Sequence, residues 1–295
     1  MITSHLLIMM IDLLTCAKEN IIPLEEQCTQ TLSGLDDYKT VQAKAFKQWV
    51  ADNAHISVNM GYFVAHLLAK GQRYKNCYEV ADANGTEIDI PNKKFLGRRL
   101  AFDAAVANSR QFKYGALNGG CCGLQTYYQG PCCVLLDADF SEKLTAFCLA
   151  GNSLKHYFPD VDISHADTNR LDDSKLQADV APYSYRHCFA TLQRIDELSQ
   201  RDKEEWARIL LDDAQGRYFE IIFLEGFSRE DLKEIRISHK EYSKIKSLTK
   251  EKSKRPLTLE EIDTLAYYKT ILENCNKPQK IDQAGYFKLE PKKKL

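Results

Sequence analysis

One carboxylate in the chain occupies a position where it is costly unless it has a role. Glu220 lies in the middle of Tyr218-Phe-Glu-Ile-Ile-Phe-Leu224, where its neighbours on both faces are aromatic or aliphatic. A mid-strand carboxylate that is fully desolvated and unpaired costs several kcal/mol. Such a residue usually lines a cleft, pairs with a cation or takes part in chemistry. Glu220 is therefore the first candidate for a catalytic residue, and an edge-strand glutamate that faces water is the alternative.

Two cations in a second segment have the spacing of an anion-binding strand. Arg73 and Lys75 alternate with Tyr74, so on a strand both cations would share one face. Two cations that face a cleft could hold a pyrophosphate, for which arginine offers bidentate contacts. A solvent-facing side of a strand is the alternative interpretation.

A glycine-rich run forms the third candidate segment. Residues 113–120 read Lys-Tyr-Gly-Ala-Leu-Asn-Gly-Gly, and glycines after a strand let the backbone approach a ligand closely. The fingerprints GxGxxG and GxxxxGK[ST] are absent, so the common nucleotide-binding loops are not predicted.

Short motifs recur in a fixed order over roughly residues 70–240, namely Tyr74-Lys-Asn-Cys-Tyr-Glu79, Asn84-Gly85, Lys113-Tyr-Gly-Ala-Leu-Asn118, Gly130-Pro-Cys132, Thr145-Ala-Phe147, Gly151-Asn-Ser153 and Tyr218-Phe-Glu220. Taken in this order, they resemble a bacterial domain family of long-unknown function that is similar to ADP-ribosyltransferases. The family has secreted members in intracellular pathogens such as Legionella. The first 70 and the last 50 or so residues lie outside the resemblance.

The resemblance implies a split, partly rolled pair of small β-sheets that grips NAD⁺ as co-substrate. In such transferases a late-strand glutamate hydrogen-bonds the ribose and stabilises the oxocarbenium ion as nicotinamide leaves, and this role maps onto Glu220. A fixed carboxylate in a dry cleft meets that electrostatic demand. By the same resemblance, the first-strand cation maps onto Arg73 or Lys75. The candidates for the middle of the site are Tyr114, Asn118 and Ser153.

The resemblance further implies a mono-ADP-ribosyltransferase effector that modifies a host protein. Secreted relatives suggest arginine as the acceptor, host NAD-dependent glutamate dehydrogenase as the protein, and delivery into host cytoplasm by a non-classical secretion system. The chain departs from arginine-directed transferases at Tyr218, where Glu or Gln is usual, and it lacks the Ser-Thr-Ser triplet of many toxins. The acceptor therefore stays open. NAD glycohydrolase, which needs the same carboxylate, is an alternative function.

Ten cysteines bring other classes of site into consideration. The adjacent pairs at 121–122 and 132–133 lack the usual spacing of zinc ligands, so no metal is expected. A cysteine hydrolase could pair Cys188 with His187, but neighbouring residues on a strand point to opposite faces. Free, buried thiols in a reducing compartment are the favoured interpretation.

Composition limits the classes of partner. The 295 residues include 40 basic and 41 acidic ones, for a net charge of −1, and nucleic-acid binding is not expected without a basic excess. Residues 239–255 hold seven basic and two acidic residues. A non-enzymatic module that binds an acidic partner there is an alternative, although such runs are more often solvated helix faces.

The N-terminus has no expected signal peptide, because the apolar run Leu6–Met10 is soon interrupted by Asp12 and no Lys or Arg precedes it. An amphipathic helix is predicted there instead. Nowhere is an apolar segment long enough to predict a membrane span.

The elements that must position these residues alternate without a βαβ rhythm, which predicts an α+β core with flanking helices. Three parts are expected: an N-terminal helical segment (1–70), a catalytic core (71–240) and a C-terminal helical extension with a basic tail (241–295). The predicted strands are Arg73–Val80, Phe112–Asn118, Cys132–Leu136, Leu144–Leu149 and Tyr218–Leu224. After the last of these, Ser228 and Asp231 predict a capped turn that runs into Ile235–Ile237. The predicted helices are Lys39–Ala54, His55–Lys70, Lys93–Val106, Glu197–Leu211 and one that Thr258 caps and that runs to Asn274.

Overall fold

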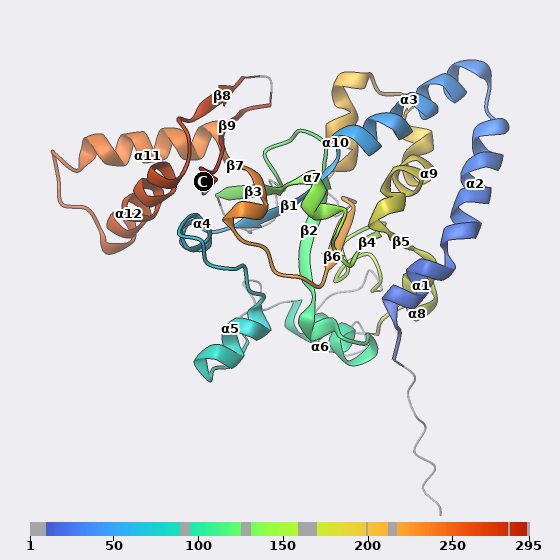
Figure 1. The fold of residues 1–295 in the computed structure, drawn as a ribbon, viewed down its shortest axis with the longest axis horizontal. Helices are drawn as coiled ribbons and strands as arrows, with labels where there is room; N and C mark the ends of the chain where they lie inside the picture. The colour runs from blue at the N-terminus through green and yellow to red at the C-terminus, as the bar shows by residue number, and fades with distance from the viewer. Residues whose placement is uncertain are drawn as a thin grey trace, which may run out of the picture.

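A computed structural model of the chain describes residues 10–88, 95–124, 131–158, 170–198, 200–211, 217–282 and 284–293. In these residues nine strands form one antiparallel sheet in the order β5-β4-β6-β2-β1-β3-β7-β9-β8 (Figure 1). The strands are β1 His55–Met60, β2 Lys113–Asn118, β3 Cys132–Leu136, β4 Ala146–Leu149, β5 Val180–Pro182, β6 Glu220–Phe223, β7 Leu232–Ser238, β8 Gln279–Ile281 and β9 Tyr286–Leu289. The predicted α+β class is confirmed.

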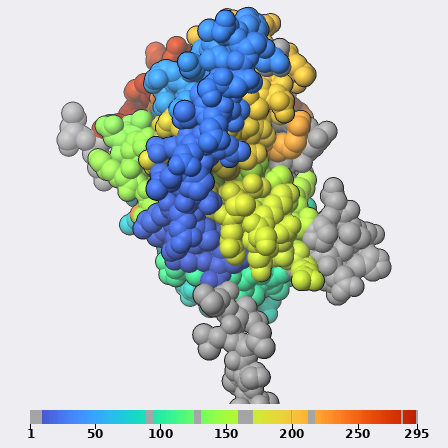
Figure 2. All heavy atoms as spheres, turned by 90° about the vertical axis from the view of Figure 1, so that its right-hand side faces the viewer, coloured from blue at the N-terminus to red at the C-terminus, as the bar shows by residue number. Residues whose placement is uncertain are grey.

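Helices flank the sheet at both of its ends. In Figure 1, α2, α3 and α9 lie at one end, and α4, α11 and α12 lie at the other. Figure 2 shows α1, α2 and α3 following one another along one side of the molecule. The α-helices are α1 Leu13–Glu19, α2 Ile21–Ser33, α3 Asp37–Asn53, α4 Tyr62–Ala69, α5 Cys77–Asn84, α6 Leu96–Ala105, α7 Ala138–Ser141, α8 Asp173–Ala178, α9 Arg186–Leu198, α10 Trp206–Leu210, α11 His239–Glu251 and α12 Leu259–Asn274.

The two faces of the sheet differ in character. Ile56 of β1, Leu117 of β2 and Ile221 of β6 point into the largest hydrophobic cluster, to which α2, α3 and α9 also contribute. Successive side chains of a strand point to opposite faces. Glu220, which is paired with Ala116 across β6 and β2, therefore lies on the other face, where the hydrophobic clusters are smaller.

Strand β1 divides the sheet into two halves. Its first residues, His55 to Ser57, pair with β2, and its last residues, Ser57 to Met60, pair with β3. Ser57 is the residue that pairs on both sides. The sheet is thus continuous rather than the separate pair that the resemblance leads one to expect, because β1 hydrogen-bonds to both halves.

Two sequence predictions of local structure are wrong. The helix expected over His55–Lys70 is wrong in its first part, because His55–Met60 is β1 and its alternate residues are buried in the large cluster. Its second part is confirmed as α4, Tyr62–Ala69. The strand expected over Arg73–Val80 is replaced by a loop and helix α5. Asn76 and Glu79 form a capping box at the start of α5, and the left-handed Gly85 ends it, so the Asn-Gly pair terminates a helix and not a hairpin strand.

Other predictions are confirmed within a residue or two. The strands at Cys132–Leu136 and Phe112–Asn118 form as expected, and Thr258 caps α12 with a capping box to Glu261.

The single helix expected over Glu197–Leu211 is wrong. The structure has the end of α9 there, followed after a break by α10.

Some predictions fall outside the described residues. The start of the amphipathic helix predicted around Leu6–Met10 lies in residues 1–9, outside the described residues, and the first described helix is α1, which Asp12 caps. Lys93, at the start of a predicted helix, and Gly130, of the motif Gly130-Pro-Cys132, likewise lie outside the described residues. Among the helices that the structure describes, none has both the length and the apolar character to cross a bilayer.

Gly115 tests the close approach of β2 to β1. A Cβ atom at Gly115 would lie 2.7 Å from the carbonyl oxygen of Ser57, which is closer than side chains and backbone normally approach. Gly115→Ala should therefore lower the free energy of unfolding by about 1–3 kcal/mol, measured by urea denaturation. Gly61→Ala is the control, because a Cβ there meets nothing within 4 Å. Equal losses of stability in the two variants would contradict this account of the close approach between the strands.

Candidate active site

Glu220 is buried, with 4% of its surface exposed, and it is surrounded by donors. The backbone N–H of Ser153 donates to Oε2 at 2.8 Å. The side-chain amide of Asn152 and the hydroxyl of Tyr218 donate to Oε1 at 3.2 and 3.4 Å. Asn152 also lies 2.6 Å from the Tyr218 hydroxyl, so the three side chains form one hydrogen-bonded group.

The fold brings these residues together through strand pairing. Leu149, the last residue of β4, is paired with Glu220, the first residue of β6. The turn that follows β4 therefore starts beside Glu220. Gly151 allows this turn to close, because a Cβ there would lie 2.7 Å from the ring of His156. The predicted Gly151-Asn-Ser153 motif thus acts through its backbone geometry as well as its side chains.

The electrostatics of Glu220 reflect a balance. Burial raises the pKa of the carboxyl above the ordinary glutamate value of 4.5. Hydrogen bonding from Ser153, the charge of Arg99 and the hydrogen bond from Tyr218 all oppose that rise. A carboxylate in this setting is poorly hydrated, so a positive charge that develops beside it would be strongly stabilised.

A second polar group extends from α6 toward Glu220. Arg99 donates to the hydroxyl of Tyr114 and lies over that ring, with its guanidinium carbon 4.3 Å from the ring centre. Arg99 also pairs with Asp103 at 3.5 Å, and Asp103 accepts a hydrogen bond from Tyr78. This chain of contacts joins α5, α6 and β2 on the face of the sheet that carries Glu220.

The structure brings together three of the residues proposed from the sequence. Glu220 and Ser153 are hydrogen-bonded, and Tyr114 lies on the same sheet face, two strand positions from the partner of Glu220. Asn118 lies further along β2 and has another role. Its side chain accepts from the N–H groups of Gly120 and Cys121, each at 2.9 Å, and so holds the loop after β2.

The two predicted cations are placed elsewhere. Arg73 and Lys75 are exposed and lie in the loop before α5, not on a shared strand face. The Arg73 side chain lies against Gly226, and the N–H of Tyr74 bonds to Phe227 at 2.7 Å. These contacts lie beyond the end of β6, whereas Glu220 begins that strand.

Sequence reasoning missed Arg99, whose charge opposes the rise of the Glu220 pKa. Arg99 lies in a helix that was predicted, but nothing in the segment Leu-Gly-Arg-Arg-Leu distinguishes Arg99 from its neighbour Arg98. Asn152 was inside a quoted motif without a role of its own. Tyr78 belonged to a segment interpreted as a strand, which placed its ring incorrectly.

The alternative cysteine site needs a correction. Cys188 and His187 lie on α9, a helix, so the argument from opposite strand faces does not apply. Hydrogen bonding from Cys28, and further from His187, lowers the pKa of Cys188. The thiols of Cys28 and Cys188 are buried, with 1% and 4% exposed, and none of the ten cysteines forms a disulfide. This pair lies in the large cluster on the sheet face opposite Glu220.

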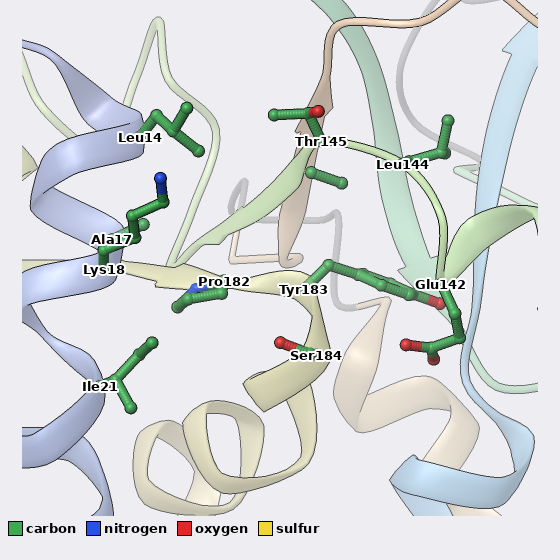
Figure 3. A pocket seen from close by; sticks show the side chains of 11 residues that line it. Leu14, Ala17, Lys18, Ile21, Glu142, Leu144, Thr145, Pro182, Tyr183 and Ser184 are labelled. Atoms are coloured by element: carbon green, nitrogen blue, oxygen red, sulfur yellow. The ribbon is translucent and has the colours of Figure 1, made fainter.

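Two pockets lie apart from Glu220. One, of about 280 Å³, opens between α1 and the edge formed by β5, with Leu14 and Lys18 facing Leu144 and Thr145 across it (Figure 3). The other, of about 350 Å³, is lined by Cys121, Cys122, Gly123, Arg208, Leu211, Ala284 and Gly285. Glu220 lines neither of them.

Comparison with models of known protein families finds no family that matches the chain, and comparison with curated proteins finds no matching relative. In the part of the chain that the structure describes, no three His, Cys, Asp or Glu side chains form a group that could hold a metal ion. The interpretation of the site therefore depends on its own geometry.

The pKa of Glu220 gives a test with a defined sign. Because folding raises this pKa, ionisation of Glu220 opposes folding as pH rises from about 4.5 through the raised value. Glu220→Gln keeps an oxygen to accept from Ser153 but does not ionise. The unfolding free energy of wild type, measured relative to that of Glu220→Gln, should therefore fall over this pH range in urea titrations. A constant difference would contradict the assignment.

Proposed function

We propose that this chain is a mono-ADP-ribosyltransferase that uses NAD⁺ as co-substrate and Glu220 as its catalytic carboxylate. The observation that carries the proposal is the buried carboxylate of Glu220, held in one orientation by the Ser153 N–H at 2.8 Å and by Asn152. A desolvated carboxylate costs free energy, and such residues are concentrated at functional sites.

The reaction needs what this residue can supply. The bond between the ribose C1′ and the nicotinamide nitrogen breaks, nicotinamide leaves with the bonding electron pair, and positive charge develops on the ribose. Glu220 would accept a hydrogen bond from a ribose hydroxyl and stabilise that charge. The acceptor then forms its bond to C1′ and loses a proton, so the products are nicotinamide, a proton and the ADP-ribosylated acceptor.

The donor set fits the nicotinamide-ribose part of NAD⁺. Hydroxyls of Tyr114 and Tyr218 and the amide of Asn152 can bond to ribose oxygens, and aromatic rings can pack against a flat nicotinamide. Arg99 is the cation associated with this group, so we assign it the phosphate-binding role that the sequence suggested for Arg73.

The strand pairing around Glu220 supports the proposal, although the sheet is continuous through β1 and is not the separate pair of sheets that the resemblance implies. Pairing of β2 with β6 and of β6 with β4 places these three strands side by side, and they carry or adjoin Tyr114, Glu220 and Ser153.

The acceptor side favours a second candidate function, NAD glycohydrolase. Arginine-directed transferases place Glu or Gln two residues before the catalytic glutamate, and the resemblance maps that position onto Tyr218. Here the Tyr218 hydroxyl points to Glu220 and Asn152. A tyrosine held in this way does not supply a carboxylate to an arginine acceptor. Water, or a side chain of a host protein other than arginine, is then the alternative acceptor.

Substitution of Glu220 tests the catalytic assignment directly. Glu220→Gln should lower the rate of nicotinamide release from NAD⁺ by about 10²–10³-fold, because the amide carries no charge to stabilise the oxocarbenium ion. Glu225→Gln is the matched control, since Glu225 lies on the same segment but accepts from Thr145. Labelled NAD⁺ with host lysate distinguishes transfer from hydrolysis. Near-normal release by Glu220→Gln would refute the proposal.

The choice between two arginines tests the NAD⁺-binding assignment. Arg99→Gln should weaken NAD⁺ binding about tenfold or more in calorimetric titration, because a hydrogen bond to a charged group is lost. Arg73→Gln should leave the affinity unchanged, because Arg73 lies beside Gly226. Circular dichroism checks that both variants fold. If the loss followed Arg73 instead, the phosphate site would lie at the other end of β6.

A further inference from the structure

The outer face of α11 is a surface of lysines. Ile245 and Leu248 are buried, and on a helix of 3.6 residues per turn they define the inner face. The exposed surface of the helix carries four lysines, with Ser243 and Ser247 among them, and Lys244 lies at the edge of the inner face because it is four residues before Leu248. The lysines are Lys240, Lys244, Lys246 and Lys250.

The acidic residues of this segment are engaged elsewhere. Glu241 accepts from the Tyr62 hydroxyl at 3.5 Å, and Glu251 pairs with Arg255, which also pairs with Glu261. The six lysines of residues 239–255 have no carboxylate within ion-pair distance in the part of the chain that the structure describes. Their charge is therefore available to a partner.

Positive charge is concentrated in residues 239–255, although the chain as a whole is close to neutral. Residues 239–255 carry a net charge of +5, whereas the whole chain carries −1. The hairpin of α11 and α12 also lies at the end of the sheet remote from α2 and α3 (Figure 1). A partner could therefore reach this face without contacting those helices.

Apolar side chains follow the basic segment directly in the chain. Leu259, at the start of α12, is 81% exposed, and Ile262 one turn later is 48% exposed. Exposed aliphatic residues next to clustered lysines are the combination with which peripheral proteins bind an anionic bilayer. Lysines act as point charges for lipid headgroups, whereas geometric recognition of phosphate usually uses arginine, and the one arginine here is already paired.

We propose that the lysine face of α11, together with Leu259 and Ile262, docks the protein on a membrane surface rich in anionic phospholipid. The lysines lie at the headgroups and the two aliphatic side chains reach into the boundary of the acyl region. This docking is independent of the Glu220 chemistry and leaves that site on another face of the fold.

Vesicle flotation of the full chain tests the docking. Vesicles of phosphatidylcholine alone are compared with vesicles that also contain about 30% phosphatidylserine, at low and at high salt. The test variant combines Lys244→Gln, Lys246→Gln and Lys250→Gln. The control removes the same charge elsewhere with Lys39→Gln, Lys44→Gln and Lys143→Gln, all at exposed positions.

Binding should require phosphatidylserine, weaken at high salt and fall at least tenfold in the α11 variant, while the control binds like wild type. Leu259→Ser should give a separate loss that remains when salt is varied, since this contribution is hydrophobic. Absence of binding to the anionic vesicles would overturn the proposal, and so would an equal loss in the control. Binding of an acidic peptide or an oligonucleotide that depends on the same lysines, without vesicle binding, would also overturn it.

Discussion

The desolvation of one carboxylate is the constraint around which this face of the sheet is built. Glu220 loses almost all of its water, so the protein must supply donors in its place. These donors come from two places in the chain, the turn after β4 and the residue two positions before Glu220 itself. The pairing of β4 with β6 brings the donors of that turn to the side of Glu220 on which Tyr218 also donates. The turn can close because residue 151 is a glycine.

Near β7, on the same sheet face, buried polar residues hold a loop in place. Arg236 of β7 pairs with Glu234 at 2.5 Å and also bonds to the loop after β2. Asn118 and Asn59 fix the same loop through its backbone. These three side chains could be mistaken for catalytic groups, but they hydrogen-bond to the backbone of a loop in place of the bonds that a helix or strand would provide. A buried asparagine with several backbone bonds is satisfied without any ligand.

The sequence predicted the parts of this fold whose signal is local. The capping box of Thr258 and Glu261 and the continuous apolar run of β3 can each be recognised from a few adjacent residues. His55–Met60 could not be recognised in this way, because its pattern suits either a helix or a strand and its partners lie more than 50 residues away. The site followed the same rule. Glu220 could be recognised because it interrupts an apolar run of the sequence, whereas Arg99 acquires its importance only from the packing of α6 on Tyr114.

The two outermost strands of the sheet have a consequence for its behaviour at high concentration. β5 is three residues long, contains Pro182 and has α1 packed beside it. β8 is also three residues long and carries Lys280. A strand edge recruits another chain through its unpaired N–H and C=O groups, and short edges that carry a proline or a charge recruit poorly. The nine-stranded sheet therefore ends at both sides in strands that resist growth into intermolecular β-structure, and the folded chain should stay monodisperse where a flat, open edge would aggregate.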